Sequence, residues 1–177
     1  MKFALRLLVT LLAVAFAASA EPRREVLTSA EIDQLRDTAQ EPEMRLKLYV
    51  KFARARLDTV DQARTNPKTT DHGQEMHDRL QDFLDIYDEL NENVDTFADR
   101  RADIRKVLKN IIEADNEFQA KLRALRDSKN APAEEAKQYE FLLGNALDTL
   151  DSSVQDHRQL LSEQEEAAKH KKLIKQQ

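Results

Sequence analysis

The chain contains no cysteine, and this absence excludes several kinds of chemistry. No disulfide can form, so an oxidising compartment would add no covalent cross-link to the fold. Covalent haem attachment and lipidation of a processed N-terminus both require a cysteine thiol, and both are therefore excluded. The stability of the folded chain must come from packing, hydrogen bonds and ion pairs alone.

Glycine is almost as scarce, with two residues in the whole chain. Loops that hold phosphate groups and the dinucleotide-binding fingerprint need several closely spaced glycines, so both are excluded. The Gly-x-Ser-x-Gly elbow of hydrolases and the Glu-x-x-His pairs of di-iron bundles are also missing from the sequence. The sequence therefore predicts no enzyme, no catalytic residue and no resident cofactor.

The four prolines lie between segments of helical periodicity and never inside one. Because proline cannot continue a helix, this distribution predicts helices separated by loops. Residues that favour helices are common, whereas β-branched and aromatic residues are few. The sequence predicts an all-α fold with helices at about 29–38, 42–64, 74–126 and 133–169.

The third of these segments carries an apolar seam whose spacing alternates between four and three residues. No glycine or proline interrupts it, which predicts one continuous helix of roughly 80 Å at the centre of an elongated antiparallel bundle. The alternative is a break near 98–103, which would give a compact up-down four-helix bundle. The seam residues are Met76, Leu80, Phe83, Tyr87, Leu90, Val94, Phe97, Arg101, Ile104, Leu108, Ile111, Asp115, Phe118, Leu122 and Leu125.

Arg101 and Asp115 are the polar members of this seam. A buried Arg101 needs a partner, and antiparallel packing of the last helix makes Glu163 the expected one. The alternative is that Arg101 extends its charge into water. In the last helix, Gly144 is interpreted as a tolerated interior glycine, with a close helix crossing as the alternative.

The first twenty residues have the order of a secretory signal peptide. Lys2 and Arg6 precede an apolar stretch that is too short to span a membrane, and Ala18 and Ala20 supply the small residues that a signal peptidase needs. Cleavage is expected after Ala20, leaving residues 21–177 as one exported domain. Because the 33 acidic residues of the chain outnumber its 28 basic ones, general nucleic-acid binding is not expected.

The stretch "DHGQEMHD", residues 71–78, poses the question of a metal site. His72 and His77 are five residues apart, so on a helix their side chains point to different faces, unlike the four-residue spacing of zinc helices. Asp71 followed by Gln74 instead has the spacing of a helix cap. The sequence predicts a helix start rather than a metal site. A haem held by inward-facing Met44 and His157 is the other cofactor considered, and nothing else supports it.

Leu27, Thr28 and Glu31 open the first helix. Thr28 and Glu31 have the spacing of a capping box. The segment also resembles the Leu-Thr-x-x-Gln motif of envelope-stress chaperones, with Glu31 in place of the glutamine. That resemblance implies a helical protein that holds other polypeptides. It covers one copy of the motif, and the capping box explains the same residues, so the chain is not assigned to that family.

Two segments of the sequence are rich in charge of one sign. An acidic run on the third segment is expected to be solvated, with cationic partners as the alternative. A basic tail at about 169–177 is expected to be frayed, with weak contact to anionic surfaces as the alternative. The function expected is that of an exported, non-enzymatic module of the cell envelope or outside it that binds or scaffolds protein. The alternative is a helical bundle that binds a small ligand or metal. The acidic run comprises Asp82, Asp85, Asp88, Glu89, Glu92, Asp95 and Asp99.

Overall fold

The structure is a computed structural model that describes residues 25–128 and 132–174. The predicted signal peptide and its cleavage after Ala20 lie outside these residues. The described residues form five α-helices and no strand, which confirms the all-α fold. None of these helices is long and apolar enough to cross a membrane. The helices are α2 (Ser29–Asp37), α3 (Pro42–Thr65), α4 (His72–Asp99), α5 (Arg105–Asp127) and α6 (Ala133–Ile174).

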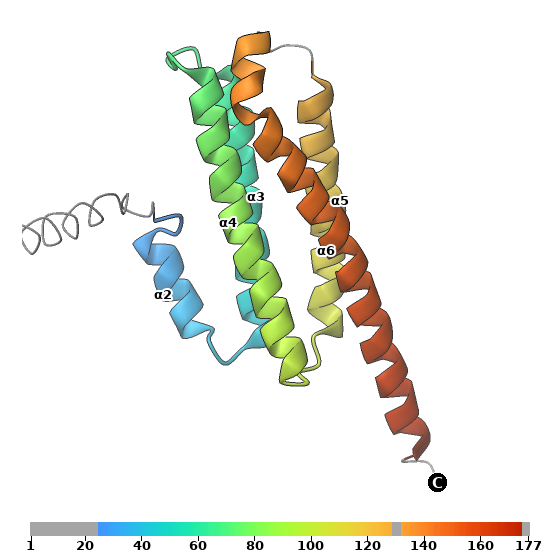
Figure 1. The fold of residues 1–177 in the computed structure, drawn as a ribbon. Helices are drawn as coiled ribbons and strands as arrows, with labels where there is room; N and C mark the ends of the chain where they lie inside the picture. Colours follow the sequence, from blue (N-terminus) through green and yellow to red (C-terminus); the bar gives the residue numbers. More distant parts are fainter. Residues whose placement is uncertain (1–24, 129–131, 175–177) are drawn as a thin grey trace, which may run out of the picture.

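Four long helices lie side by side around one apolar core. They run alternately up and down, and α2 forms a short arm along one side (Figure 1). The helices α3 and α6 each pack against both α4 and α5, so all four share the core. Leu80, Phe83, Leu108 and Ile111 of the predicted seam are completely buried in it. The heptad pattern therefore identified the core positions correctly.

The single helix predicted for residues 74–126 is wrong. The helix α4 ends at Asp99, α5 begins at Arg105, and the chain reverses between them so that α5 runs back along the bundle (Figure 1). The alternative, a break near 98–103, is the arrangement that the structure has. The seam continues across the break because Phe97 and Ile104, on either side of it, are both buried.

The helix α4 ends in a C-cap of the kind that usually contains a glycine, but an arginine occupies the glycine position here. Arg101 has φ 58°, in the left-handed region where a side chain costs about 1–2 kcal/mol and glycine is the usual residue. The Arg101 amide donates to the carbonyl of Ala98 at 2.8 Å, and the Ala102 amide donates to the carbonyl of Phe97 at 3.0 Å. These two hydrogen bonds define a Schellman motif, which ends the helix without a glycine or proline in the sequence.

A glutamine of α6 holds this connection in place. Gln164 accepts a hydrogen bond from the amide of Ile104 and donates one to the carbonyl of Ala102, both at 3.1 Å. Arg101 is exposed, and no ion pair joins it to Glu163 in the part of the chain that the structure describes. The predicted pair is therefore wrong, and the exposed alternative for Arg101 is correct. Glu163 accepts a hydrogen bond from Gln159 instead.

The two glycines differ in how closely other residues surround them. A Cβ added to Gly144 would meet nothing within 4 Å, so this residue is a tolerated interior glycine, as predicted. A Cβ at Gly73 would lie 2.6 Å from the side chain of Gln138 and 2.9 Å from the carbonyl oxygen of Glu135. The close crossing is therefore between the start of α4 and the start of α6, and Gly73 permits it.

The helix α6 is much longer than the other helices. Its 42 residues exceed the 28 of α4, a difference of roughly 20 Å at 1.5 Å per residue. Its C-terminal part projects beyond the end of the bundle (Figure 1). The helix continues to Ile174, which lies within the basic tail at about 169–177. Residues 175–177 lie outside the described part.

Candidate functional site

A buried polar network joins α4, α5 and α6 inside the apolar core. Asp115 is completely buried, and its two carboxylate oxygens face different partners. The hydroxyl of Tyr87 donates to Oδ1 at 2.8 Å, and Nδ1 of His157 lies 2.9 Å from Oδ2. Because a carboxylate only accepts hydrogen bonds, Nδ1 of His157 carries a proton in this arrangement. The network resembles a set of acid–base groups, which makes it the first candidate for a functional site.

The surroundings of this network favour a structural role. Burial raises the pKa of Tyr87 well above its usual range, and the negative charge of Asp115 raises it further, so the phenol stays protonated. Tyr87 also packs against Phe83 and Phe118 with ring centroids 5.8 and 6.3 Å away. None of the three polar residues lines any of the surface grooves described below. The network therefore joins three helices inside the core and lines neither groove.

The stretch at residues 71–78 is the start of α4, as predicted. Asp71 caps the helix by accepting a hydrogen bond from the amide of Gln74 at 3.0 Å. His72 lies near α3, with Nδ1 3.2 Å from the carbonyl oxygen of Ala63, whereas His77 pairs with its neighbour Asp78. The structure thus separates the two histidines. Within residues 25–128 and 132–174, no group of three or more His, Asp or Glu side chains is placed so that it could hold a metal ion.

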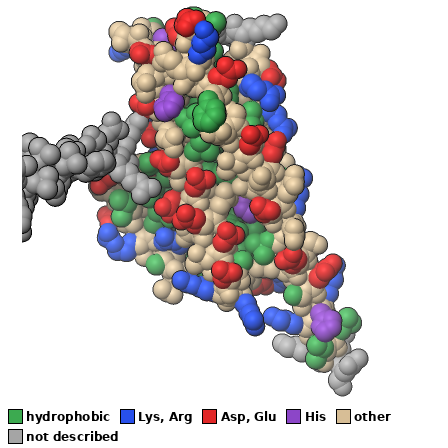
Figure 2. Space-filling view, viewed as in Figure 1, with side chains coloured by type: hydrophobic (Ala, Val, Ile, Leu, Met, Phe, Trp, Pro, Cys, Tyr) green, Lys and Arg blue, Asp and Glu red, His purple; other side chains and the backbone are tan. Residues whose placement is uncertain are grey.

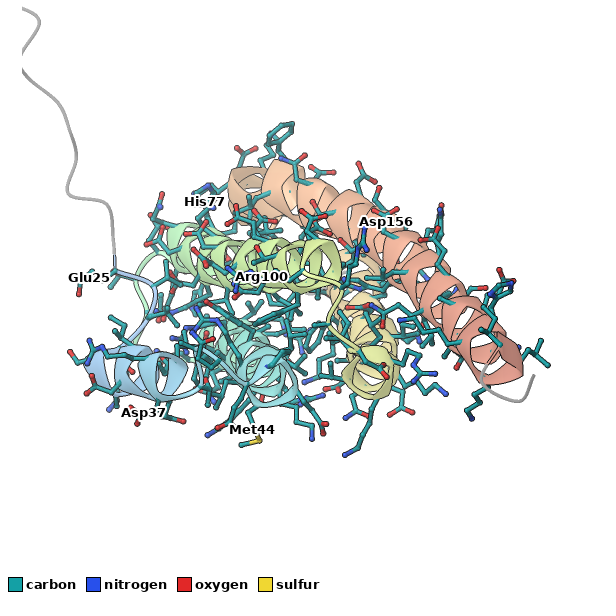
Figure 3. All side chains as sticks on the ribbon, turned by 90° about the horizontal axis from the view of Figure 1, so that it is seen from below. Glu25, Asp37, Met44, His77, Arg100 and Asp156 are labelled. Atoms are coloured by element: carbon teal, nitrogen blue, oxygen red, sulfur yellow. The ribbon has the colours of Figure 1, made fainter. Side chains whose placement is uncertain are left out.

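Met44, which was expected to face inward, is exposed on α3 and points away from the bundle (Figure 3).

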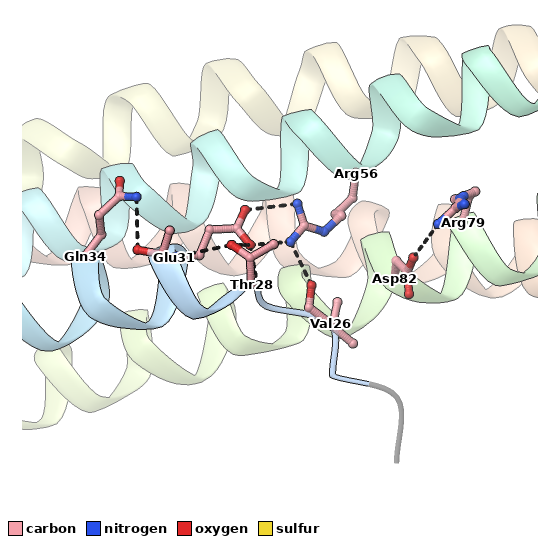
Figure 4. Close-up of polar contacts among 8 residues, drawn as sticks. Val26, Thr28, Glu31, Gln34, Arg56, Arg79 and Asp82 are labelled. Carbon is pink, nitrogen blue, oxygen red and sulfur yellow. Dashed lines mark hydrogen bonds and ion pairs between the residues drawn. The ribbon is translucent and has the colours of Figure 1, made fainter. Parts of the chain in front are cut away.

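The capping box at the start of α2 is present and is part of a larger cluster. Glu31 accepts a hydrogen bond from the Thr28 amide at 2.8 Å and pairs with Arg56 of α3 at 2.6 Å (Figure 4). Arg56 also donates to the carbonyl of Val26 at 2.7 Å. The Glu31 and Arg56 side chains are only 13% and 15% exposed. The residues that resemble the chaperone motif therefore fix α2 to α3.

A second arginine of α3 holds the other end of α2. Arg45 donates to the carbonyl of Leu35 at 2.6 Å and to the side chain of Asn93 in α4 at 2.7 Å. Leu35 is the buried residue of α2. With both ends fixed, α2 lies beside α4 and forms one wall of a groove. Neither arginine could be recognised from the sequence, because the partners of both lie on other elements.

This groove, the α2–α4 groove, has an apolar floor and an acidic rim. Its volume is about 380 Å³. Ile32 is 38% exposed in it, and Val26, Leu27 and Ile86 complete the floor. In the residues described, no lysine or arginine forms an ion pair with any rim carboxylate. Acidic side chains are spread over this face of the molecule in Figure 2. The rim residues are Glu25, Asp85, Asp88, Glu89 and Glu92.

The concentration of carboxylates on the rim affects the pKa of one of them. Partial burial raises the pKa of Asp88, and the nearby negative charges of Asp85 and Glu92 raise it further. A cation in the groove would relieve that repulsion. Asp82, which belongs to the same acidic run, behaves differently. It is buried and lies 3.5 Å from Arg79, so the expectation of a fully solvated acidic face is wrong at this position.

A second groove lies between the α4–α5 connection and the projecting end of α6. This α6 groove has a volume of about 470 Å³. Alanines and one leucine make up its apolar part, and side chains of both charges surround it. Arg101 and Glu163, which do not pair with each other, both line it. Its residues are Ala98, Arg101, Ala102, Asp103, Arg105, Leu160, Glu163, Gln164, Ala167, Ala168, Lys171 and Lys172.

Comparison of the chain with models of known families, with curated proteins and with solved structures finds no match. The candidate sites therefore have to be judged on their own geometry. The interior holds a satisfied polar network, whereas the two open grooves lie on the surface.

Proposed function

We propose that this chain is an exported, non-enzymatic helical bundle that binds polypeptide segments in the α2–α4 groove. The observation that carries the proposal is the composition of that groove, in which an apolar floor is bordered by carboxylates that form no ion pair with a lysine or arginine among residues 25–128 and 132–174. A charged side chain on an open helix is ordinary, but a rim of one sign around exposed Ile32 is well suited to a ligand that is both cationic and apolar.

The arrangement of the rim indicates the form of the ligand. Asp85, Asp88 and Glu92 follow one another at steps of three and four residues, so they share one face of α4. A bound amphipathic helix with lysines or arginines at the same steps would place its cations opposite these carboxylates and its apolar stripe on Ile32 and the half-buried Leu27. The proposed ligand is therefore a cationic amphipathic segment of another protein.

The non-enzymatic part of the proposal is supported by the interior. Tyr87 and His157 both hydrogen-bond to Asp115, and none of these three acid–base groups lines either groove. Export rests on the sequence of residues 1–20 alone. It is tested by the intact mass of the protein recovered from outside the producing cytoplasm, which should lack Met1 to Ala20.

Peptide binding to the purified mature protein tests the proposal. The probe is an amphipathic helix of leucine and lysine, and its counterpart has glutamate in place of lysine. Calorimetry should detect binding of the first peptide only. Replacing three rim carboxylates (Asp85→Asn, Asp88→Asn and Glu92→Gln) should weaken binding about tenfold, because each exposed ion pair contributes roughly 0.5 kcal/mol.

A matched control removes the same number of charges elsewhere. Asp37, Asp95 and Asp99 are exposed and do not line the groove, so changing them to asparagine should leave the affinity nearly unchanged. Ile32→Ser should weaken binding as well, because it removes exposed apolar floor. If neither peptide binds, or if both triple variants lose affinity equally, the α2–α4 groove is not the binding site.

A further inference from the structure

The projecting end of α6, the α6 overhang, consists of residues 158–174. His157 is the last buried residue of the helix, so no side chain of the overhang is buried. The segment is roughly 25 Å long. Its first residues still contact the bundle through Leu160, Leu161 and Gln164, whereas the end beyond them projects as a single helix (Figure 1). A short single helix is only marginally stable in water when nothing packs against it. Leu173 and Ile174 at its end are 63% and 61% exposed. The overhang therefore has the properties of a helix that packs against a partner.

The α6 groove gives this partner its place. One wall of the groove is the face of the overhang that carries Leu160, Glu163, Ala167 and Lys171. These residues follow one another at steps of three and four, so they form one stripe along the helix. Ala167 at the middle of the stripe is small and exposed, which allows a second helix to approach closely. The opposite wall, Ala98 and Ala102, is small as well.

The order of charges along the overhang indicates which helix fits. The first half carries Glu163, Glu165 and Glu166, and the second half carries Lys169, Lys171 and Lys172. Two such helices side by side in the same direction would place like charges opposite each other. Running in opposite directions and crossing at Ala167, they would place Glu163 of each copy opposite Lys171 of the other. The same crossing places Leu160 opposite Ile174.

We propose that two copies of this chain associate through their α6 overhangs, antiparallel about a two-fold axis at Ala167, so that each overhang fills the α6 groove of the other copy. The arrangement is closed, because the same surface of both copies is used and no further copy can add to it. It uses none of the residues of the α2–α4 groove. The dimer and the proposed peptide binding can therefore be tested separately.

Sedimentation of the mature protein at several concentrations tests the association. Lys171→Glu should weaken the dimer about tenfold, because two symmetry-related attractive pairs become repulsive. Adding Glu163→Lys to that variant should restore the dimer, because both charges are then exchanged in both copies. Both residues are exposed, so neither change is expected to disturb the fold. The dimer should also weaken at high salt, because the paired charges are near water.

Crosslinking tests the two-fold axis directly. The chain has no cysteine, so Ala167→Cys introduces a single thiol at the proposed crossing, where mild oxidation should yield a covalent dimer. Ser162→Cys is the matched control: it is exposed on the same overhang but on another face, and it should crosslink far more slowly. A protein that stays monomeric at every concentration overturns the proposal. A dimer that crosslinks equally at both positions also overturns it. So does a dimer whose affinity is the same in the parent, in Lys171→Glu and in the double variant with Glu163→Lys.

Discussion

In the interior of the bundle, Nδ1 of His157 in α6 lies 2.9 Å from a carboxylate oxygen of Asp115 in α5, and the two side chains are 4% and 0% exposed. The other oxygen of Asp115 accepts a hydrogen bond from Tyr87 in α4. One carboxylate thus satisfies polar groups from two other helices. Because buried polar groups are costly when they lack partners, the whole network depends on Asp115.

Asp115→Ala is expected to lower the free energy of unfolding by about 3–5 kcal/mol, because it leaves the hydroxyl of Tyr87 and Nδ1 of His157 buried without their partner. Urea unfolding of the parent and the variant measures this loss. In a Tyr87→Phe/His157→Phe background the same change should cost much less, because the polar groups that it would leave unpaired are gone. A loss below about 1 kcal/mol in the parent background would contradict the network.

The pairing of Asp115 with His157 could not be predicted from the sequence, although both residues could be placed. The heptad spacing put each of them on the inner face of its helix, and both are buried. Their meeting depends on how far α6 is shifted along α5, and no local pattern encodes that shift. The pairing of Arg56 with Glu31 was missed for the same reason. The caps at Thr28 and Asp71, which depend on residues three apart, were predicted correctly.

The break between α4 and α5 was predicted only as the alternative to a continuous helix, and the reason is a different one. Helix ends are usually recognised by glycine or proline, and this one has Arg101 in the glycine position. The apolar spacing also passes through the connection unchanged, because Phe97 and Ile104 both face the core. What stabilises the break is the pair of hydrogen bonds from Gln164, which is about sixty residues away in sequence. Local sequence carries no trace of that contact.

Replacing each of the two glycines by alanine is expected to change the free energy of unfolding in opposite directions. Gly144→Ala should raise the free energy of unfolding by about 1 kcal/mol, because alanine favours helices and its Cβ meets nothing. Gly73→Ala should lower it by about 1–3 kcal/mol, because its Cβ would press on the carbonyl of Glu135 and on Gln138. Thermal unfolding of both variants measures the difference. Stabilisation by both would mean that α4 and α6 do not cross closely at Gly73.

The connection between α4 and α5 gives a second prediction, which compares glycine substitutions at two adjacent arginines. Arg101→Gly should raise the free energy of unfolding by about 0.5–1 kcal/mol, because glycine adopts φ 58° without the penalty of a Cβ. Arg100→Gly is the control: φ there is −75°, so glycine only adds freedom to the unfolded chain and should be neutral or destabilising. Urea unfolding of both variants is the measurement. In a continuous helix both glycines would destabilise, so a loss of stability at Arg101 would contradict the break.

The half-buried ion pair between Glu31 and Arg56 gives a prediction on pH. Burial of Glu31 opposes ionisation, but the hydrogen bonds from Arg56 and Thr28 outweigh it and hold the pKa of Glu31 below its usual value of 4.5. Because the pKa is lower in the folded state than in the unfolded state, ionised Glu31 stabilises the fold fully above pH 4.5. That contribution is lost as the pH falls through the lowered pKa.

Glu31→Gln should therefore lower the free energy of unfolding by about 1–2 kcal/mol near neutral pH, because it removes a charge-assisted hydrogen bond that is largely shielded from water. As the pH falls below 4.5, the parent loses the same interaction, so the melting temperatures of parent and variant should converge. Asp33→Asn is the control, since its pair with Arg36 is 65% exposed on the Asp33 side and should contribute little at any pH. A gap between parent and Glu31→Gln that stays constant from neutral to strongly acidic pH would show that the Glu31 charge does not hold α2 on α3.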